Sequence, residues 1–139
     1  MARYAHHAGV VLGKLDAGDL AGFVSHFHEN ASFRFGAQPV IQGVHAIMGH
    51  VRELVAPLAS IRHRIDRQLT TDDLVIVFGQ LVRSTRNGRS LSTPFCHTWR
   101  LSSGYTIIDM QVYCDRAPAI RRQATSAGRP GDSDVLSFS

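Results

Sequence analysis

The chain has 139 residues, enough for one domain, and with 44% hydrophobic and 19% charged residues it has the composition of an ordinary soluble globular protein. Its apolar runs fall short of the roughly 20 residues that span a bilayer, and the N-terminus lacks the apolar stretch of a secretory signal, so we expect a cytoplasmic protein. The net charge of +4 comes from basic residues spread along the chain without an aromatic-plus-basic RNA motif, so we expect neither a nucleic acid nor a membrane as partner.

The N-terminal part of the sequence favours helices interrupted by short extended segments. Apolar residues recur at helical spacing before Leu15, and again after Asp19, which is a good N-cap residue. Asn30 ends the second helix, and Pro57 ends a third. The expected elements are helices over about 2–15, 20–29 and 44–56, and strands over about 31–35 and 38–42.

After the third helix the apolar period changes to two, which predicts strands. One face of the first strand is expected to carry Ile61, His63, Ile65 and Leu69. The next strand, over 74–84, is apolar on both faces, as in the centre of a sheet. Turns are expected at 71–73, at the Asn-Gly of 86–89 and at the Ser-Ser-Gly of 102–104.

The last predicted hairpin, 94–115, directs an imidazole at an apolar face. Phe95, His97, Trp99 and Leu101 alternate with smaller or polar residues, so His97 lies among large apolar side chains. His63 interrupts an apolar strand face in the same way. Because burial moves pKa values, both histidines are candidates for acid–base chemistry.

The order of the elements predicts an α+β domain, with helices against one face of an antiparallel meander. A strongly twisted sheet folded over helices leaves a conical hollow, where small ligands bind. We expect the domain to occupy 1–115. Residues 116–139, rich in Arg, Ala, Ser, Gly and Pro, are expected to form a C-terminal tail or lid.

Metal, thiol and nucleotide chemistry have no pattern in this sequence. The histidine and cysteine spacings match no zinc site, and there is no Gly-rich phosphate loop or dinucleotide fingerprint. Cys96 and Cys114 could lie close across the last hairpin, but in a reducing compartment we expect buried thiols. We therefore expect no metal and no cofactor.

Four parts of the chain resemble the SnoaL-like, or nuclear-transport-factor-2-like, superfamily. They are 15–20 with 27–31, then 43–47, the strand around His63, and the last strand, whose Val112-Tyr113-Cys114-Asp115 matches an aromatic-x-Asp ending. The resemblance covers about 4–115. It implies a cone-shaped, barrel-like domain with a strongly curved antiparallel sheet wrapped around the N-terminal helices, and a homodimer through the convex sheet face. Members include polyketide cyclases, ketosteroid isomerases, epoxide hydrolases, dehydratases and domains without catalysis.

Among these branches, the resemblance to dehydratases is the most complete. The tyrosine and aspartate of ketosteroid isomerases fall on Val11 and Phe35, and the acid of polyketide cyclases and epoxide hydrolases falls on Val112. Dehydratases such as scytalone dehydratase have an aspartate near the end of the first helix and a histidine on the first long strand, which match Asp16 and His63. The branch's tyrosine on the first helix again falls on Val11.

We predict His63 as a base, Asp16 as the carboxylate that orients it, and His97 as a second acid or oxyanion donor. Two alternatives are open at this point. His63 could be a structural histidine bonded to a backbone carbonyl, and Asp16 could cap the junction between the first two helices. The expected pocket wall, suited to a flat apolar or aromatic substrate, consists of Trp99, Phe78, Met110, Phe35 and Val112.

The face that the last strand presents decides whether the pocket has a further acid. If Ile108, Met110 and Val112 face the hollow, then Asp109 and its alternating neighbours face outward, where we expect the dimer contact. A slip of one residue would swap the faces and make Asp109 a pocket acid.

The predicted function is that of a cofactor-independent enzyme of secondary-metabolite biosynthesis with an apolar, polyketide-like or aromatic small-molecule substrate. It would move a proton next to a carbonyl, as in a cyclase, a dehydratase (a lyase) or an isomerase. One alternative is a non-catalytic ligand-binding or dimerisation module of the same fold. Another is an epoxide hydrolase-like enzyme that uses Asp109.

Overall fold

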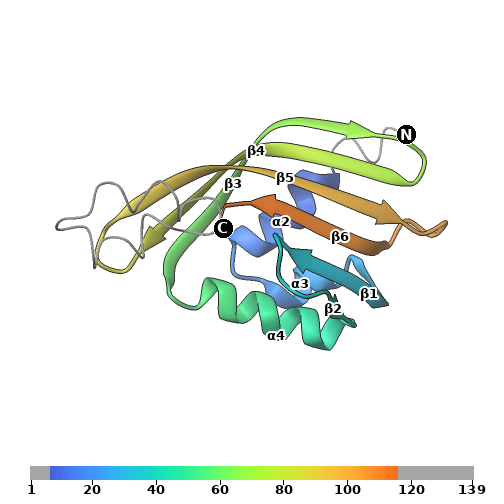
Figure 1. Ribbon diagram of the computed structural model, residues 1–139, viewed down its shortest axis with the longest axis horizontal. Helices are drawn as coiled ribbons and strands as arrows, with labels where there is room; N and C mark the ends of the chain where they lie inside the picture. The colour runs from blue at the N-terminus through green and yellow to red at the C-terminus, as the bar shows by residue number, and fades with distance from the viewer. Residues whose placement is uncertain (1–6, 116–139) are drawn as a thin grey trace.

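The computed structural model describes residues 7–115, which form helices against one face of a six-stranded sheet (Figure 1). In chain order the elements are α2 (His7–Asp16), α3 (Leu20–Val24), β1 (Phe27–Phe35), β2 (Ile41–Gln42), α4 (Val44–Val55), β3 (Leu58–Thr70), β4 (Leu74–Thr85), β5 (Ser90–Leu101) and β6 (Ile107–Cys114). None of the helices in this part of the chain is long and apolar enough to cross a membrane. The tail or lid expected over 116–139 lies outside the described residues.

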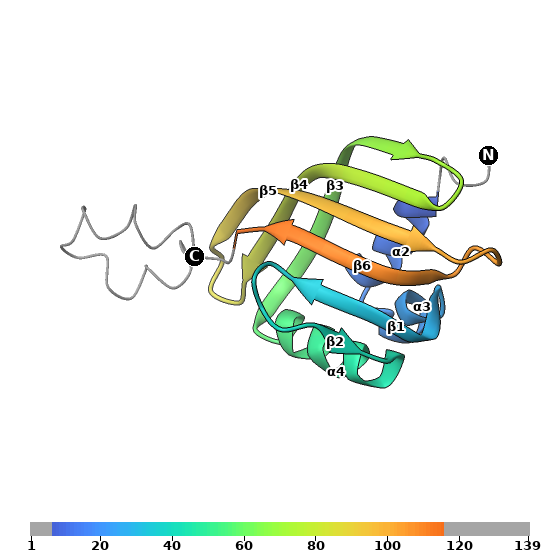
Figure 2. The same cartoon turned by 45° about the vertical axis from the view of Figure 1, so that its right-hand side comes forward.

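The strand order is β2-β1-β6-β5-β4-β3, and the sheet curves around the helices without closing (Figures 1 and 2). Every neighbouring pair is antiparallel except β1 and β6, which run parallel. The predicted α+β class, with a curved sheet around N-terminal helices, is confirmed.

The sheet has an inner face toward the helices and an outer face away from them. In β4 the buried residues are every second one, from Val75 and Val77 to Leu81 and Arg83, and these define the inner face. They pack with Trp99 and Met110, both 0% exposed, and with Ile47 of α4. The inner face therefore packs with the helices into the apolar core of the domain.

The second predicted helix is shorter than its apolar spacing indicates. It begins after Asp19, whose Oδ1 accepts a hydrogen bond from the Gly22 backbone N–H at 2.8 Å, but it ends at Val24. The helix ends early because the next residues pair with another strand: Phe27 starts β1 and lies beside Ile107 of β6. A parallel contact between segments 80 positions apart leaves no local signal, and it overrides the helical pattern.

A bulge in β3 corrects the expected face of Leu69. The register of β3 against β4 shifts between Ile65 and Arg67, so Leu69 lies opposite Ile76 on the outer face and is 48% exposed. The bulge brings the Arg64 carbonyl close to Gly79, where a Cβ atom would be 1.9 Å from that oxygen. Only glycine fits at this position of β4 without a shift of the backbone.

A second bulge changes the start of β6. The register shifts between Arg100 and Leu101, so Ile107, rather than the predicted Ile108, is fully buried. Beyond the bulge, Met110 and Val112 lie on the inner face. This is the first of the two alternatives that the sequence left open, in which Asp109 faces outward.

Candidate functional site

An apolar cavity lies between the inner face of the sheet and the helices. It holds about 590 Å³ of empty space, including space open to solvent, and its few polar side chains are two histidines and one arginine. Its lining comprises Leu15, Phe23, Phe33, Phe35, Val51, Leu54, Val55, Leu58, Ile61, His63, Leu81, Arg83, His97, Met110 and Val112. A mainly apolar lining with a few polar side chains is typical of a site for a small organic ligand.

Asp16, the last residue of α2, holds His63 of β3 through two hydrogen bonds. Its Oδ1 lies 2.7 Å from Nδ1 of the ring, and its Oδ2 accepts from the His63 backbone N–H at 2.8 Å. The His63 side chain is 4% exposed. The alternative role of Asp16 as a helix cap is not what the structure shows, since Asp19 caps α3.

The Asp16 contact sets the tautomer of His63. An ionised carboxylate only accepts hydrogen bonds, so Nδ1 carries the proton and, in the neutral ring, Nε2 keeps its lone pair. Nε2 has no hydrogen-bond partner among residues 7–115. A carboxylate-held imidazole with a free Nε2 on a cavity wall is the arrangement of a general base.

His97 of β5 has the opposite tautomer. The Trp99 indole N–H, which can only donate, lies 3.1 Å from Nδ1 of His97, so the proton of the neutral ring is on Nε2. Burial lowers the pKa of His97 well below the ordinary value of 6.5, and a positive charge on the neighbouring His63 ring would lower it further. His97 therefore stays neutral at pH 7 and can donate through Nε2–H.

The two imidazoles meet at the cavity wall. Their ring centroids are 5.8 Å apart, and each lies 5.2 Å from the ring of Phe95 in an edge-on contact. One ring offers a lone pair and the other an N–H, so the site can remove a proton and stabilise the oxygen on which negative charge develops.

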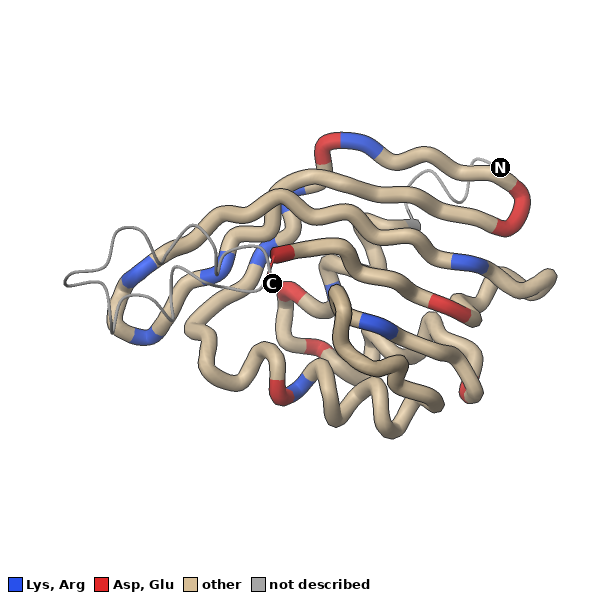
Figure 3. The backbone as a smooth tube through the Cα atoms, in the orientation of Figure 1, with Lys and Arg blue, Asp and Glu red and all other residues tan. Residues whose placement is uncertain are grey.

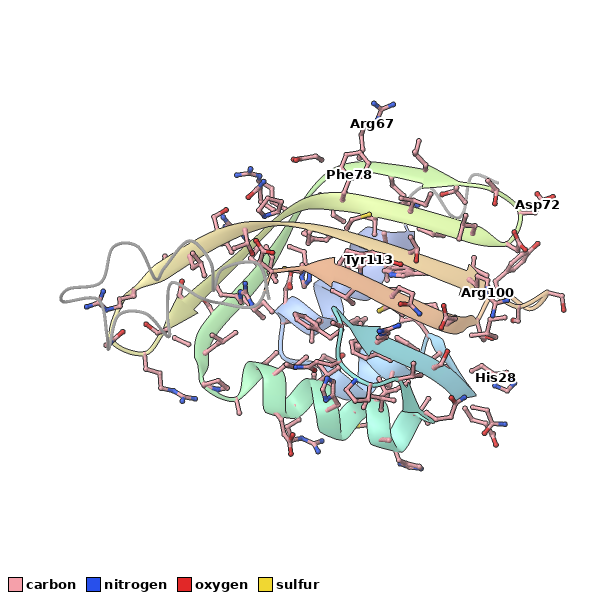
Figure 4. The ribbon with its side chains drawn as sticks, viewed as in Figure 1. His28, Arg67, Asp72, Phe78, Arg100 and Tyr113 are labelled. Atoms are coloured by element: carbon pink, nitrogen blue, oxygen red, sulfur yellow. The ribbon has the colours of Figure 1, made fainter. Side chains whose placement is uncertain are left out.

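The predicted pocket wall is placed correctly in part. Phe35, Met110 and Val112 line the cavity. Trp99 is fully buried behind His97, so it supports the site without lining it. Phe78 does not line the cavity: it lies opposite Arg67 on the outer face, and Figure 4 shows it projecting from β4 away from the helices.

Asp109 also lies on the outer face, opposite Arg100 of β5. There its Oδ1 accepts a hydrogen bond from the Ser32 hydroxyl at 2.5 Å. A carboxylate at that position cannot reach the cavity, so the structure does not favour the alternative of an epoxide hydrolase-like site built on Asp109.

The two cysteines are free and lie on different faces. Cys96 is opposite Tyr113, whereas Cys114 is opposite Phe95. Within residues 7–115 there is no group of three or more His, Cys, Asp or Glu side chains that could hold a metal ion.

Sequence reasoning missed Arg83, the one charged side chain on the cavity wall among the described residues. A signal was present, because Arg83 continues the period-two series of Val77, Gly79 and Leu81 on β4. Because this strand is apolar on both faces, its pattern does not decide which face Arg83 shares.

The neutral state of His97 predicts how stability depends on pH. Below pH 6.5 the unfolded chain protonates this histidine while the folded chain does not, so the free energy of unfolding falls with falling pH, by at most about 1.4 kcal/mol per pH unit. Urea unfolding between pH 5 and pH 8 measures the slope. His97→Asn, whose Oδ1 takes the position of Nδ1 and can accept from Trp99, is expected to flatten it, and an unchanged slope would contradict a buried neutral His97.

The SnoaL-like domain model matches residues 12–109 of this chain. Among solved structures, an NTF2-like protein of unknown function from Burkholderia pseudomallei has a TM-score of 0.73 at 18% identity, covering 82% of this chain and 92% of that chain. A putative SnoaL-like polyketide cyclase from Shewanella denitrificans has a TM-score of 0.71 at 12% identity, covering 86% and 94%.

TerC, co-crystallized with polyporic acid, has a TM-score of 0.69 at 17% identity, covering 81% of this chain and 91% of that chain. No curated protein matches the chain. At such identities the likeness to solved structures shows a shared fold.

Proposed function

The chain belongs to the SnoaL-like domain family, as its motifs predicted, and from this premise we propose that it is a cofactor-independent acid–base enzyme. Its substrate would be an apolar, polyketide-like or aromatic small molecule with a carbonyl group. The reaction would be a cyclisation, a dehydration or an isomerisation. The observation that carries the proposal is the Asp16–His63 pair beside His97 on one apolar cavity wall.

In the proposed reaction, Nε2 of His63 removes a proton from the carbon next to the substrate carbonyl. The imidazolium that forms is stabilised by Asp16, whose oxygen already lies 2.7 Å from Nδ1. The electron pair moves onto the carbonyl oxygen, and His97 donates its Nε2–H to that oxygen. If the His63 imidazolium returns the proton to another atom of the substrate, the substrate is isomerised. If it passes the proton to a hydroxyl group whose C–O bond breaks as the electron pair returns from the oxygen, the group leaves as water and the substrate is dehydrated.

The lining supports a substrate with a flat apolar body. Phe23, Phe33 and Phe35 contribute rings to the cavity, and Met110 contributes a flexible thioether that adapts to irregular shapes. TerC, of the same fold, was co-crystallized with polyporic acid, which is consistent with an organic ligand here.

The proposal is tested with a probe that needs only a base and an apolar pocket. Nitrobenzisoxazole is a flat aromatic compound whose ring N–O bond breaks when a base removes its carbon-bound proton, releasing a coloured phenolate. We expect the protein to accelerate this reaction above imidazole at equal concentration, with saturation kinetics. Binding of the probe without acceleration would favour the alternative, a non-catalytic ligand-binding module, which Val112 at the family's acid position also favours.

We also propose that two copies of the chain pair through the outer face. Phe78, Cys96 and Tyr113 lie side by side across β4, β5 and β6, and Tyr113 is 54% exposed. A row of aromatic and apolar groups with polar neighbours is typical of an interface between copies.

Phe78→Arg is expected to convert a dimer into a monomer, because it places a charge in the centre of that row. Light scattering after size-exclusion chromatography measures the mass. Val40→Arg, which adds the same charge at a 52% exposed apolar residue elsewhere, is the matched control and should stay dimeric. A monomeric parent protein, or a dimeric Phe78→Arg, would count against this interface.

A further inference from the structure

Arg83 is a buried cation on the cavity wall. It is 8% exposed. Its Nη2 donates to the Thr93 hydroxyl at 3.1 Å and to the Asp115 backbone carbonyl at 3.3 Å. Its Nε is buried without any hydrogen-bond partner. Buried donors in folded proteins are nearly always satisfied, so the free Nε indicates a partner that residues 7–115 do not supply.

The guanidinium also lacks a counter-ion among the described residues. The ion pairs found there join Lys14 to Asp19, His63 to Asp16 and Arg64 to Asp66, and both partners of Arg83 are neutral groups. Burying a charge without an opposite charge nearby is strongly unfavourable. An unpaired buried cation therefore suggests that a bound ligand supplies the opposite charge.

The β4–β5 hairpin that carries Arg83 supplies no carboxylate. From Leu74 to Ile108 the sequence contains four arginines and no aspartate or glutamate, and Figure 3 shows only basic residues along the β4–β5 hairpin. Asp16, the nearest carboxylate to the imidazoles, uses both of its oxygens to hold His63. Asp115, whose backbone carbonyl accepts from Arg83, is an exposed residue and forms no ion pair with it, so within residues 7–115 no carboxylate pairs with the guanidinium on the cavity wall.

We infer that Arg83 binds a carboxylate of the substrate, so that the ligand is an aromatic or polyketide-like acid rather than a neutral molecule. Both hydrogens of Nη2 are used within the chain, so the donor left for a carboxylate oxygen is the unpartnered Nε–H, in a hydrogen bond strengthened by the opposite charges. This inference deepens the proposed function, since it assigns a substrate class to the same cavity, but the binding that it predicts does not require catalysis.

The strand register places the anion site relative to the base. On the inner face, Arg83 of β4 lies opposite Ile61 of β3. The next inner-face pair along the same two strands is Leu81 opposite His63. A ligand whose carboxylate pairs with Arg83 thus extends its body along β3 and β4 over His63. The carboxylate would fix which carbon reaches the base.

Naphthoate and its neutral amide, naphthamide, are matched probes for the test. Isothermal titration of the whole protein is expected to show at least tenfold tighter binding of naphthoate. Arg83→Met, which keeps the length and apolar stem of the side chain, should remove this preference. Arg86→Met removes the same charge from the exposed end of the same hairpin and should keep the preference.

Equal affinity for the two probes, or no saturable binding of naphthoate, would overturn the inference even if Arg83→Met failed to fold. A preference retained in folded Arg83→Met would overturn it as well. The melting temperature separates binding from a structural role: loss of an uncompensated buried charge should leave it unchanged or raise it, whereas a structural arginine predicts a clear fall. The proposed function fails separately, if nitrobenzisoxazole turnover does not depend on His63.

Discussion

Replacing His63 with alanine is expected to lower the rate of nitrobenzisoxazole turnover by about 10²–10⁴-fold, because the variant loses the imidazole that Asp16 holds on the cavity wall. The effect should fall on kcat more than on KM, since the apolar walls that bind the probe remain. Stopped-flow or plate-based absorbance of the released phenolate measures it.

His28→Ala is the matched control for this prediction. His28 lies on β1 at the surface, where its Nδ1 accepts a hydrogen bond from the Asn30 backbone N–H. Its removal deletes the same ring without touching the cavity, so turnover should be unchanged. If the two variants behaved alike, or if His63→Ala turned over at the parent rate, His63 would not be the base.

Replacing Asp16 with asparagine is expected to cost turnover on a similar scale, between about 10² and 10⁴-fold. An asparagine can still accept from the His63 backbone, but it no longer stabilises the imidazolium, and its amide N–H₂ can hold the ring in the opposite tautomer. Asp16 acts through His63, which makes it a positioning residue.

A double variant distinguishes this role from damage to the fold. When His63 is already alanine, Asp16→Asn should lower the rate no further, because the group it positions is absent. Asp19→Asn, at the cap of α3, is a control that removes a neighbouring carboxylate outside the cavity. Additive losses in the double variant would show that Asp16 contributes independently of His63.

Much of the site could be predicted from the sequence because its residues lie on strands with regular alternation. His63 and His97 each interrupt an apolar series of period two, and both line the cavity that this pattern predicted. Asp16 matches an aspartate position of the dehydratases, and this match predicted the carboxylate that holds His63. Local patterns of this kind persist into the fold when the strand is not interrupted.

The errors have a common physical cause, which is non-local pairing. The bulge of β3 exists because two strands meet, and it moves Leu69 to the outer face. Phe78 was assigned to the pocket because β4 is apolar on both faces, so its own pattern cannot choose between them. Arg83 escaped notice because a missing counter-ion is a property of the surroundings, which no sequence window contains.

Two neighbouring histidines with opposite tautomers, one an acceptor and one a donor, are the basis of the proposed chemistry. Nitrogen NMR of the histidine-labelled protein at pH 7 measures this directly. The hydrogen bonds predict protonated Nδ1 and bare Nε2 for the neutral ring of His63, and bare Nδ1 and protonated Nε2 for His97. The same tautomer in both rings, or a doubly protonated His97, would contradict it.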